Sequence, residues 1–390
     1  MNRSRLLFFL ASMVLILPLV AGNLSARDEA SDEDSFFKHL AVFTEVFGLV
    51  NQAYVEPPND EILMAGALDG ATDALDPFSL YVPEEGTRAY EAARQVGDRR
   101  SGVLLLRERG VVYVVGVSDG SPASEAGVQV GDMVAEVQGE ATRLMPLWKI
   151  QTTLAGEAGN EVSLKVYRNQ ETLDLNFSLG TFEVPALDYS VADQAGVLKF
   201  FQVGASTVLE VARALEAERT RGGERLLLDL RGVSAGDAEV AYEIAGLFAE
   251  GDLGSLKNRD DQIQSFEGSK ARWQGSKLVV LIDRGTLGAA EVLATVLRQK
   301  LSADLVGERS FGYAGRARRV ELSSGGHLWI TDAFYTGPDG EPLRGSLLPD
   351  LMVSSRSWDV EESEGEEKDL ILERGLDHLM TDEQEEKAAA

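Results

Sequence analysis

Two carboxylates at the ends of apolar segments are the first groups in this sequence that could do chemistry. Asp229 lies at the end of the apolar run 226–230, and Asp283 ends the run 278–283. Both runs are typical of buried strands, and carboxylates at strand ends can act as general acids or bases. The chain contains no cysteine, which excludes disulfides, thiolate metal sites and cysteine nucleophiles.

The three histidines offer little catalytic or metal-binding potential. His39 falls in an expected helix, His327 in an expected strand pair and His378 in an expected terminal helix. None has a partner at the spacing of a metal site or a catalytic triad. We therefore expect each histidine to be structural, and we expect neither a metal nor another cofactor.

Acidic residues dominate the charge of the chain. The sequence has 37 basic and 64 acidic side chains, for a formal net charge of −27. This balance argues against nucleic acid as a partner, because phosphates are bound through Lys and Arg. The one compact basic cluster is 316–319. It would either attract a carboxylate-bearing ligand or pair with the protein's own acids on a solvated strand face.

The first 26 residues have the layout of a secretory signal peptide. Arg3 and Arg5 precede an apolar run at 6–20, and small residues lead up to Ala26. This run is shorter than the roughly 20 residues that a membrane-spanning helix needs, so cleavage near Ala26 is favoured over a retained anchor. We expect an exported protein that is periplasmic or envelope-associated.

The periodicity of apolar residues changes twice along the mature chain. Helical spacing comes first, strand spacing follows from about residue 99, and from about 184 strands alternate with amphipathic helices. That alternation predicts an α/β core of crossover units within an α+β multidomain fold. The expected segments are a signal peptide (1–26), a helical region (35–98), a β domain (99–182), an α/β core (184–355) and an acidic C-terminal helix and tail (356–390). The expected core elements are strands at 197–203, 226–230 and 278–283 and helices at 206–219, 237–250 and 288–300.

Residues 117–134 resemble the signature of a PDZ domain. They read V-x-x-G-S-P-A-x-x-A-G-V-x-x-G-D-x-V. Gly120 and Gly127 suit tight turns, and Pro122 suits the first turn of a helix. The resemblance implies that a partner's C-terminal tail adds as a strand beside a groove, where backbone N–H groups hold its carboxylate.

The loop that corresponds to this peptide-binding site departs from the PDZ pattern at one position. The loop consists of Ser101, Gly102, Val103 and Leu104. The family often has a second glycine where Leu104 stands, which weakens the prediction of tail binding. The alternative is a module used only for internal docking.

From residue 37 to 379 the chain resembles the C-terminal processing peptidases, also called tail-specific proteases. The resemblance rests on short motifs in the family's order. They are L-D-P-F-S-x-Y at 75–81, the PDZ segment, L-D-L-R at 228–231, V-V-L-I-D at 279–283, V-G-E-x-x-F-G at 306–312 and L-P-D at 348–350. The family joins a helical region, a PDZ domain and an α/β core, and it cuts polypeptides with a serine activated by a lysine. In it, Asp229 and Asp283 would belong to the framework.

The positions that the resemblance makes catalytic hold residues unable to perform the reaction. The family's S-A-S-A-S-E segment reads T-L-G-A-A-E at 286–291, which puts Gly288 at the nucleophile position. Tyr313 stands where the family has its lysine base, and Ala317 where it has a supporting glutamine. A tyrosine with a pKa of about 10 is a poor base at neutral pH. The loss of all three groups predicts a pseudopeptidase.

The region that would stabilise an oxyanion is also altered. The family's N-P-G-G corresponds to V-S-A-G at 233–236, which places Ala235 and Gly236 there. Backbone N–H donors can survive the change, because an oxyanion hole depends on main-chain geometry. Ala235 would be strained if its position required a positive φ.

Two hydroxyl groups near the lost positions are possible substitute nucleophiles. Thr286 precedes Gly288 by two residues, about 7 Å along an extended chain, and Ser310 lies near Tyr313. Neither has an evident lysine beside it, because Lys300 ends the following helix and points away from its start. We expect both to be turn and surface residues.

Two functional hypotheses follow. The first is an exported pseudopeptidase that binds polypeptide C-terminal tails, or a related active protease, through its PDZ domain. The alternative is an active serine-type C-terminal processing endopeptidase with a rearranged nucleophile. The phenylalanine-rich helix expected at 35–54 predicts an assembly surface, with a homodimer as one outcome. Its alternative role is to complete the protein's own helical core.

Overall fold

The computed structural model describes residues 35–260, 262–354 and 369–381. The expected signal peptide and most of the acidic tail lie outside these ranges. The chain divides into two compact units, up to residue 64 and from residue 65 onward. Helices and sheets are mixed, which confirms the expected α+β class. The finer domain boundaries expected from the sequence stay a prediction.

The N-terminal region is helical, as its periodicity predicts. A helix at 35–53 precedes α2 (Asp60–Asp73), whose first turn is capped by the Asn59 side chain. Helix α3 (Glu84–Val96) follows Pro83 and ends at Gly97, where φ is 60°. Between α2 and α3 the chain forms β1 (Leu80–Val82), which pairs with a strand almost 250 residues later and was not predicted.

The next segment is a small β domain. Its sheet has the order β2-β3-β4-β6-β7, with β5 paired to β4, so β2 is an edge strand. The strands are β2 (Val103–Glu108), β3 (Val111–Val117), β4 (Met133–Val137), β5 (Glu140–Ala141), β6 (Glu161–Arg168) and β7 (Glu171–Ser178). The helices are α4 (Pro122–Glu125), η1 (Thr142–Leu144) and α5 (Leu147–Leu154). The glycine-rich signature supplies the turns around α4, since Gly120, Gly127 and Gly131 all have positive φ.

The α/β core is built on a six-stranded sheet of order β17-β14-β13-β10-β9-β8. All of its neighbouring strands are parallel except β8, which is antiparallel to β9. The strands are β8 (Leu187–Ala192), β9 (Ala195–Phe200), β10 (Arg225–Asp229), β13 (Lys277–Ile282), β14 (Asp304–Gly307) and β17 (Leu351–Met352). The helices are α6 (Ala205–Arg221), α7 (Ala238–Ala245), α8 (Ala289–Leu301) and α9 (Leu370–Met380).

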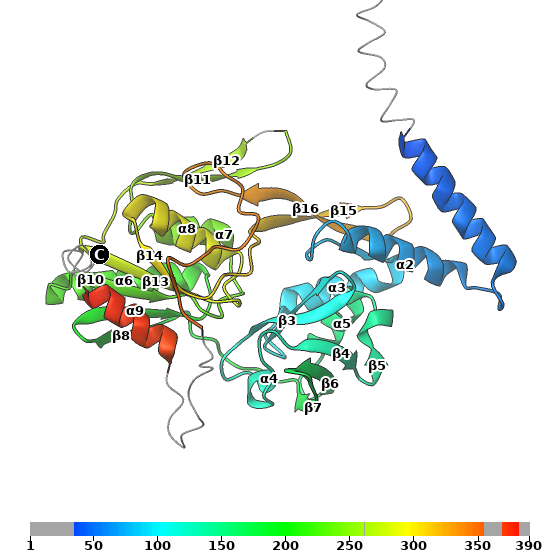
Figure 1. Cartoon of the computed structure of the whole chain (residues 1–390), viewed down its shortest axis with the longest axis horizontal. Coiled ribbons are helices and arrows are strands. Elements are labelled where there is room, and N and C mark those ends of the chain that lie inside the picture. The colour runs from blue at the N-terminus through cyan, green and yellow to red at the C-terminus, as the bar shows by residue number, and fades with distance from the viewer. Residues whose placement is uncertain (1–34, 261, 355–368, 382–390) are drawn as a thin grey trace, which may run out of the picture. The chain divides into compact units, whose positions relative to one another are not determined.

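Helices cover both faces of this sheet, with α7 and α8 on one face and α9 on the other (Figure 1). Because both faces of the sheet are buried, the strand sequences are continuous apolar runs. In β10, Leu226 and Leu228 join the buried cluster beneath α6, α7 and α8, whereas Leu227 packs with Ile371 and Leu379 of α9. Helix α7 is shorter than the helix expected at 237–250, because the chain turns at Gly246 after Ala245.

A second sheet extends the core and carries part of the candidate site. Its order is β1-β16-β11-β12, and β15 pairs with β16. The strands are β11 (Gly251–Lys257), β12 (Gln262–Gly268), β15 (Gly315–Glu321) and β16 (His327–Tyr335). In the part of the chain that the structure describes, no helix has the length and apolar character needed to cross a membrane.

Candidate functional site: a catalytic position without its side chains

Gly288 is the N-cap of α8 and has φ 60° and ψ −106°. Residues other than glycine rarely adopt this conformation, which characterises the strained turn that exposes a serine nucleophile in other hydrolases. A Cβ atom at this position would meet only the Tyr313 carbonyl oxygen, at 4.0 Å. The turn is therefore present and has room for a side chain, but glycine provides no group that could form an acyl-enzyme.

A buried carboxylate connects this turn to the loop that carries Tyr313. Glu291 is 2% exposed and accepts hydrogen bonds from the backbone N–H of Gly288 at 3.0 Å and of Tyr313 at 2.9 Å. It also accepts hydrogen bonds from Ser310 Oγ and the Gly312 N–H. Burial raises the pKa of Glu291, and these hydrogen bonds oppose that effect. Sequence reasoning used Glu291 only to align the motif and missed this role.

The side chain of Tyr313 is held by aromatic contacts and one hydrogen bond. Its hydroxyl donates to Thr331 Oγ1 at 2.7 Å, and its ring stacks on Phe78 with a centroid distance of 4.5 Å. Burial raises the pKa of Tyr313 above its usual value, so the phenolate needed for a base is absent at neutral pH. Ala317 pairs with Thr331 across β15 and β16. Glu291 thus links Gly288 to Tyr313, and Thr331 links Tyr313 to the strand position of Ala317.

The loop assigned to the oxyanion region contacts the turn before Gly288. The Leu287 N–H donates to the Val233 carbonyl oxygen at 3.1 Å, and the Ala235 carbonyl accepts from the Val203 N–H at 3.1 Å. Ala235 is not among the described residues with positive φ, whereas Gly236 has φ 158°, and a Cβ atom there would lie 2.7 Å from Val203 Cβ. Ala235 therefore carries no left-handed strain. A role of Ala235 and Gly236 at an oxyanion stays a prediction.

Thr286 and Ser310 are buried, so the expectation that they are surface residues is wrong. They are 0% and 2% exposed. Thr286 Oγ1 donates to the Leu230 carbonyl at 3.0 Å and accepts from the Asp283 N–H at 2.9 Å. Ser310 Oγ donates to Glu291 and accepts from the Leu347 N–H at 2.8 Å. Both hydroxyls hold turns together, because polar groups at buried turns must find partners.

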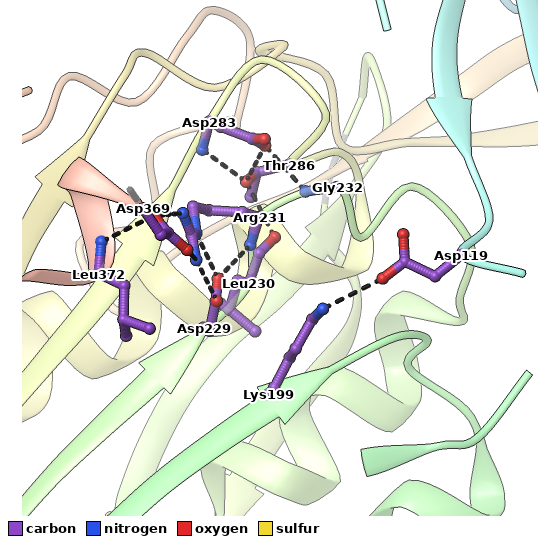
Figure 2. Close-up of polar contacts among 10 residues, drawn as sticks. All are labelled: Asp119, Lys199, Asp229, Leu230, Arg231, Gly232, Asp283, Thr286, Asp369 and Leu372. Atoms are coloured by element: carbon purple, nitrogen blue, oxygen red, sulfur yellow. Dashed lines mark hydrogen bonds and ion pairs between the residues drawn. The ribbon is translucent and has the colours of Figure 1, made fainter. Parts of the chain in front are cut away.

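The carboxylates at the strand ends are bound within the framework (Figure 2). Asp229 contacts Arg231 through both oxygens, at 2.8 and 2.6 Å. The same guanidinium contacts Asp369 at 2.6 and 2.8 Å. Asp283 accepts hydrogen bonds from the Gly232 and Gly285 N–H groups, both at 2.9 Å, and burial raises its pKa. Sequence reasoning missed the pairing of Arg231 with Asp369, which are 138 residues apart.

The basic cluster on β15 pairs mainly with the protein's own acids. Arg316 and Arg318 contact Asp332 at 2.9 and 3.1 Å. Arg319 contacts Glu91 and Glu321. This outcome matches the second of the two roles considered from the sequence, a solvated strand face.

Two of the three histidines each lie beside a single carboxylate. His378 Nε2 is 2.9 Å from Asp304, and His327 Nδ1 is 3.5 Å from Glu91. Within the described ranges, no group of three or more His, Asp or Glu side chains is arranged to hold a metal ion.

The loop expected to bind a peptide carboxylate already uses two of its N–H groups. The Gly102 N–H donates to the Asp98 carbonyl at 2.6 Å, and the Val103 N–H donates to Ser101 Oγ at 3.3 Å. A side chain at Gly102, where φ is 79°, would overlap the side chain of Ser121 at 2.0 Å. Gly102 is thus required by close packing inside the β domain. Leu104 begins the apolar surface described next.

One face of the β domain packs on the loop before Gly288. Leu106 and Val115 form a buried cluster with Leu287, and Leu104, Tyr113, Phe78, Phe311 and Tyr313 pack against it. A Cβ atom on Gly116 of β3 would lie 1.9 Å from Ser234 Oγ. Strand β3 therefore approaches the loop at 233–236 directly, and the β domain covers part of the candidate site.

Comparison with known proteins identifies both domains. Residues 194–353 match peptidase family S41, and residues 100–179 match the PDZ domain. The carboxy-terminal-processing protease of Bartonella bacilliformis is 26% identical over 362 residues, which cover 90% of this chain and 82% of that protein. The carboxy-terminal processing protease CtpA of Bacillus subtilis is 25% identical, over 87% of this chain and 75% of the relative.

The fold comparison agrees with the sequence matches. A solved photosystem II D1 C-terminal processing protease superimposes with a TM-score of 0.67 and 22% identity, over 80% of this chain and 92% of that chain. The chain therefore combines an S41 peptidase core with a PDZ domain. The chain as a whole is similar to the C-terminal processing peptidases, the family that its motifs resemble.

Proposed function

We propose that this protein is a non-hydrolysing member of its peptidase family that acts by binding polypeptide. The observation that carries the proposal is Gly288, a glycine at the nucleophile position on an otherwise intact turn. Tyr313 and Ala317 leave the site without a base and without the supporting amide. An acyl-enzyme needs a nucleophilic atom and a group that removes its proton, and both are missing here.

The burial of the neighbouring hydroxyls argues against the alternative of a relocated nucleophile. Thr286 and Ser310 each donate and accept hydrogen bonds with buried groups of neighbouring segments. Neither hydroxyl contacts a lysine or a histidine in those bonds. Activating either one would require breaking the turn that holds it.

The PDZ domain supplies the proposed binding surface, either for polypeptide C-termini or for an active relative of this protein. Strand β2 is an edge strand, so an extended peptide can add to it beside α5. The Gln151 side chain reaches across from α5, with its amide nitrogen 3.5 Å from the Leu105 carbonyl. With this amide at the strand edge and two loop N–H groups already engaged, we expect micromolar or weaker affinity.

The purified mature protein should cleave no unstructured C-terminal tail and should not react with serine-directed covalent probes. Digests followed by mass spectrometry measure both properties, with an active serine protease as the positive control. Stoichiometric labelling of any serine or threonine would contradict the proposal and support the relocated nucleophile.

Apolar C-terminal peptides should bind weakly through the PDZ groove, and Gln151→Ala should strengthen binding several-fold because it frees the edge of β2. Thr153→Ala, on the same helix, is the matched control. Calorimetric titration gives the affinities. Equal affinities of wild type and Gln151→Ala would show that the peptide does not pair with this edge.

We also propose that the protein is exported to the periplasm or envelope. The arginine-led apolar segment at 6–20 and the small residues before residue 27 support this. Sequencing the N-terminus of protein recovered from a fractionated bacterial host tests it. A chain beginning near residue 27 in the periplasmic fraction is expected, and an uncleaved cytoplasmic chain would contradict it.

A further inference from the structure

An open cavity of about 420 Å³ lies beside Tyr313 in the peptidase-like core. It is bordered by the turn after α2, the loop at Gly312, strand β16 and the loop before β17. Leu75, Ile330 and Phe334 provide apolar surface, and hydroxyl groups and a guanidinium provide polar surface. Cavities of this size with a few polar groups are typical of small-ligand sites.

The guanidinium belongs to Arg344, whose backbone forms an antiparallel bridge with Tyr313. Its carbon lies 4.3 Å from the centre of the Phe334 ring. Among the residues that the structure describes, no carboxylate pairs with Arg344, whereas Arg316 contacts Asp332. Because a guanidinium stays protonated at all physiological pH values, it supplies a charge but no base. Tyr313, which stands at the family's lysine position, therefore has the permanently charged Arg344 as its cross-strand neighbour.

A hydroxyl donor faces the same cavity. Thr331 Oγ1 accepts a hydrogen bond from Tyr313 at 2.7 Å, which leaves its own proton to donate. The acidic lining residue, Asp76, accepts hydrogen bonds from the Phe78 and Ser79 N–H groups and from the Ser79 hydroxyl, each at 2.8 Å. These bonds hold the Asp76 carboxylate in its own turn, and burial together with the charge of Asp76 raises the pKa of Tyr313.

We propose that this cavity binds a carboxylate that is joined to an apolar group, as in the C-terminal residue of a polypeptide. Arg344 forms the ion pair with the carboxylate, and the Thr331 hydroxyl donates a hydrogen bond to it. Ile330 and Phe334 contact the apolar side chain. The proposal deepens the proposed polypeptide binding, but it places the carboxylate in the core and does not depend on the PDZ groove.

The test uses the mature chain and two probes, each with a free carboxylate and as its amide. One probe is an N-acetylated hexapeptide ending in Leu-Phe, and the other is N-acetylphenylalanine, which is too short to add as a strand. The variants are Arg344→Gln, which keeps the side-chain length, and Thr331→Val, which keeps the shape. Arg318→Gln removes an exposed arginine outside the cavity lining and is the control.

Wild type and Arg318→Gln should bind each free acid at least about tenfold more tightly than its amide, since a charge-assisted pair is lost on amidation. Arg344→Gln should abolish this preference, and Thr331→Val should weaken it by several-fold. Calorimetry measures the affinity of the hexapeptide, and saturation-transfer NMR measures the affinity of N-acetylphenylalanine. Circular dichroism checks that each variant is folded.

The outcomes separate this inference from the proposed function. If Arg344→Gln keeps the preference for the free acid, the carboxylate is held elsewhere and the inference is overturned, while polypeptide binding stands. If N-acetylphenylalanine binds in an Arg344-dependent way but the hexapeptide does not bind, the cavity is confirmed and the proposed polypeptide binding fails. If neither probe binds, the inference and the proposed polypeptide binding are both overturned.

Discussion

Gly288 has a backbone conformation typical of a nucleophile turn, although glycine has no side chain. Its φ of 60° is held by contacts of its neighbours, chiefly the Glu291 carboxylate and the bond from Leu287 to Val233. None of these contacts involves a side chain at 288. Since glycine adopts positive φ without strain, it suits this position better than any residue with a side chain.

Gly288→Ala should lower the free energy of unfolding by about 1–2 kcal/mol more than Gly204→Ala. Both residues are helix N-caps with open space where a Cβ atom would lie, but Gly204 has φ −139° and Gly288 has φ 60°. The difference therefore isolates the backbone strain. Urea denaturation measures it, and equal effects of the two substitutions would contradict the strain argument.

Restoring the three lost side chains should not restore proteolysis. In the variant Gly288→Ser, Tyr313→Lys and Ala317→Gln, the lysine would replace a ring packed between Phe78 and Phe334. The supporting contacts of an active site would still be missing, and catalytic groups must be held within about 0.5 Å of their working geometry. Cleavage of an unstructured peptide, followed by mass spectrometry, would disprove this expectation.

At the level of elements, the start of α8 depends on a carboxylate clamp, by which we mean the buried Glu291 carboxylate and the four hydrogen bonds that it accepts from Gly288, Ser310, Gly312 and Tyr313. Glu291→Gln should lower the free energy of unfolding by at least about 2 kcal/mol, because hydrogen bonds to a charged acceptor are weakened and one buried donor loses its partner. Glu243→Gln, at an exposed position on α7, is the control and should have little effect. Similar stability of the two variants would show that the clamp is not needed.

An ion pair between Arg231 and Asp369, the N-cap residue of α9, connects this helix to the core. Burial opposes the charge of Asp369, but the hydrogen bonds from Arg231 prevail, and the pKa of Asp369 is lowered. A carboxyl group with a lowered pKa in the folded state contributes stability above its ordinary pKa of about 4, and this contribution is lost as the pH falls through the lowered value.

Acidification to about pH 3 should therefore accelerate hydrogen exchange of the α9 amides several-fold relative to the core strands, after correction for intrinsic rates. Asp369→Asn should produce the same local loosening at pH 7. Asp377→Asn, at an exposed position on α9, should not. Uniform exchange of α9 in all three proteins would show that the ion pair does not hold the helix.

At the scale of the whole molecule, the helix at 35–53 carries several large apolar side chains that are exposed to solvent. Phe36 is 62% and Phe37 61% exposed, and Phe43 is 41% exposed. We expect this helix to mediate assembly, because exposed apolar patches mark interaction sites. A homodimer is the simplest form, and the competing role is packing on the protein's own core.

Sedimentation of the mature protein across a dilution series should show a concentration-dependent mass, and Phe43→Ser with Phe47→Ser should shift it to the monomer. Lys38→Ser, on the same helix, is the control and should behave like wild type. A monomer at all concentrations, with only a loss of stability in the double variant, would support the core role instead.

Local pattern was sufficient to predict most elements of the fold. The period of apolar residues predicted β10, β13 and α8 within one residue of their observed bounds, because each buries apolar side chains against a neighbouring layer. Turn glycines identified the PDZ signature, and the motif around 286–291 predicted Gly288 at the nucleophile position. These features depend on residues close together in the chain.

The tertiary structure decided what depends on distant residues. The pairing of β1 with β16, the bonds between Arg231 and Asp369, and the burial of Thr286 and Ser310 leave no periodic trace in the sequence. The sequence by itself determined which side chains stand at the positions that the family resemblance makes catalytic, since each of these residues can be read from one position. Only the folded chain brought Arg344 beside Tyr313, because cross-strand neighbours are set by long-range pairing rather than by local propensity.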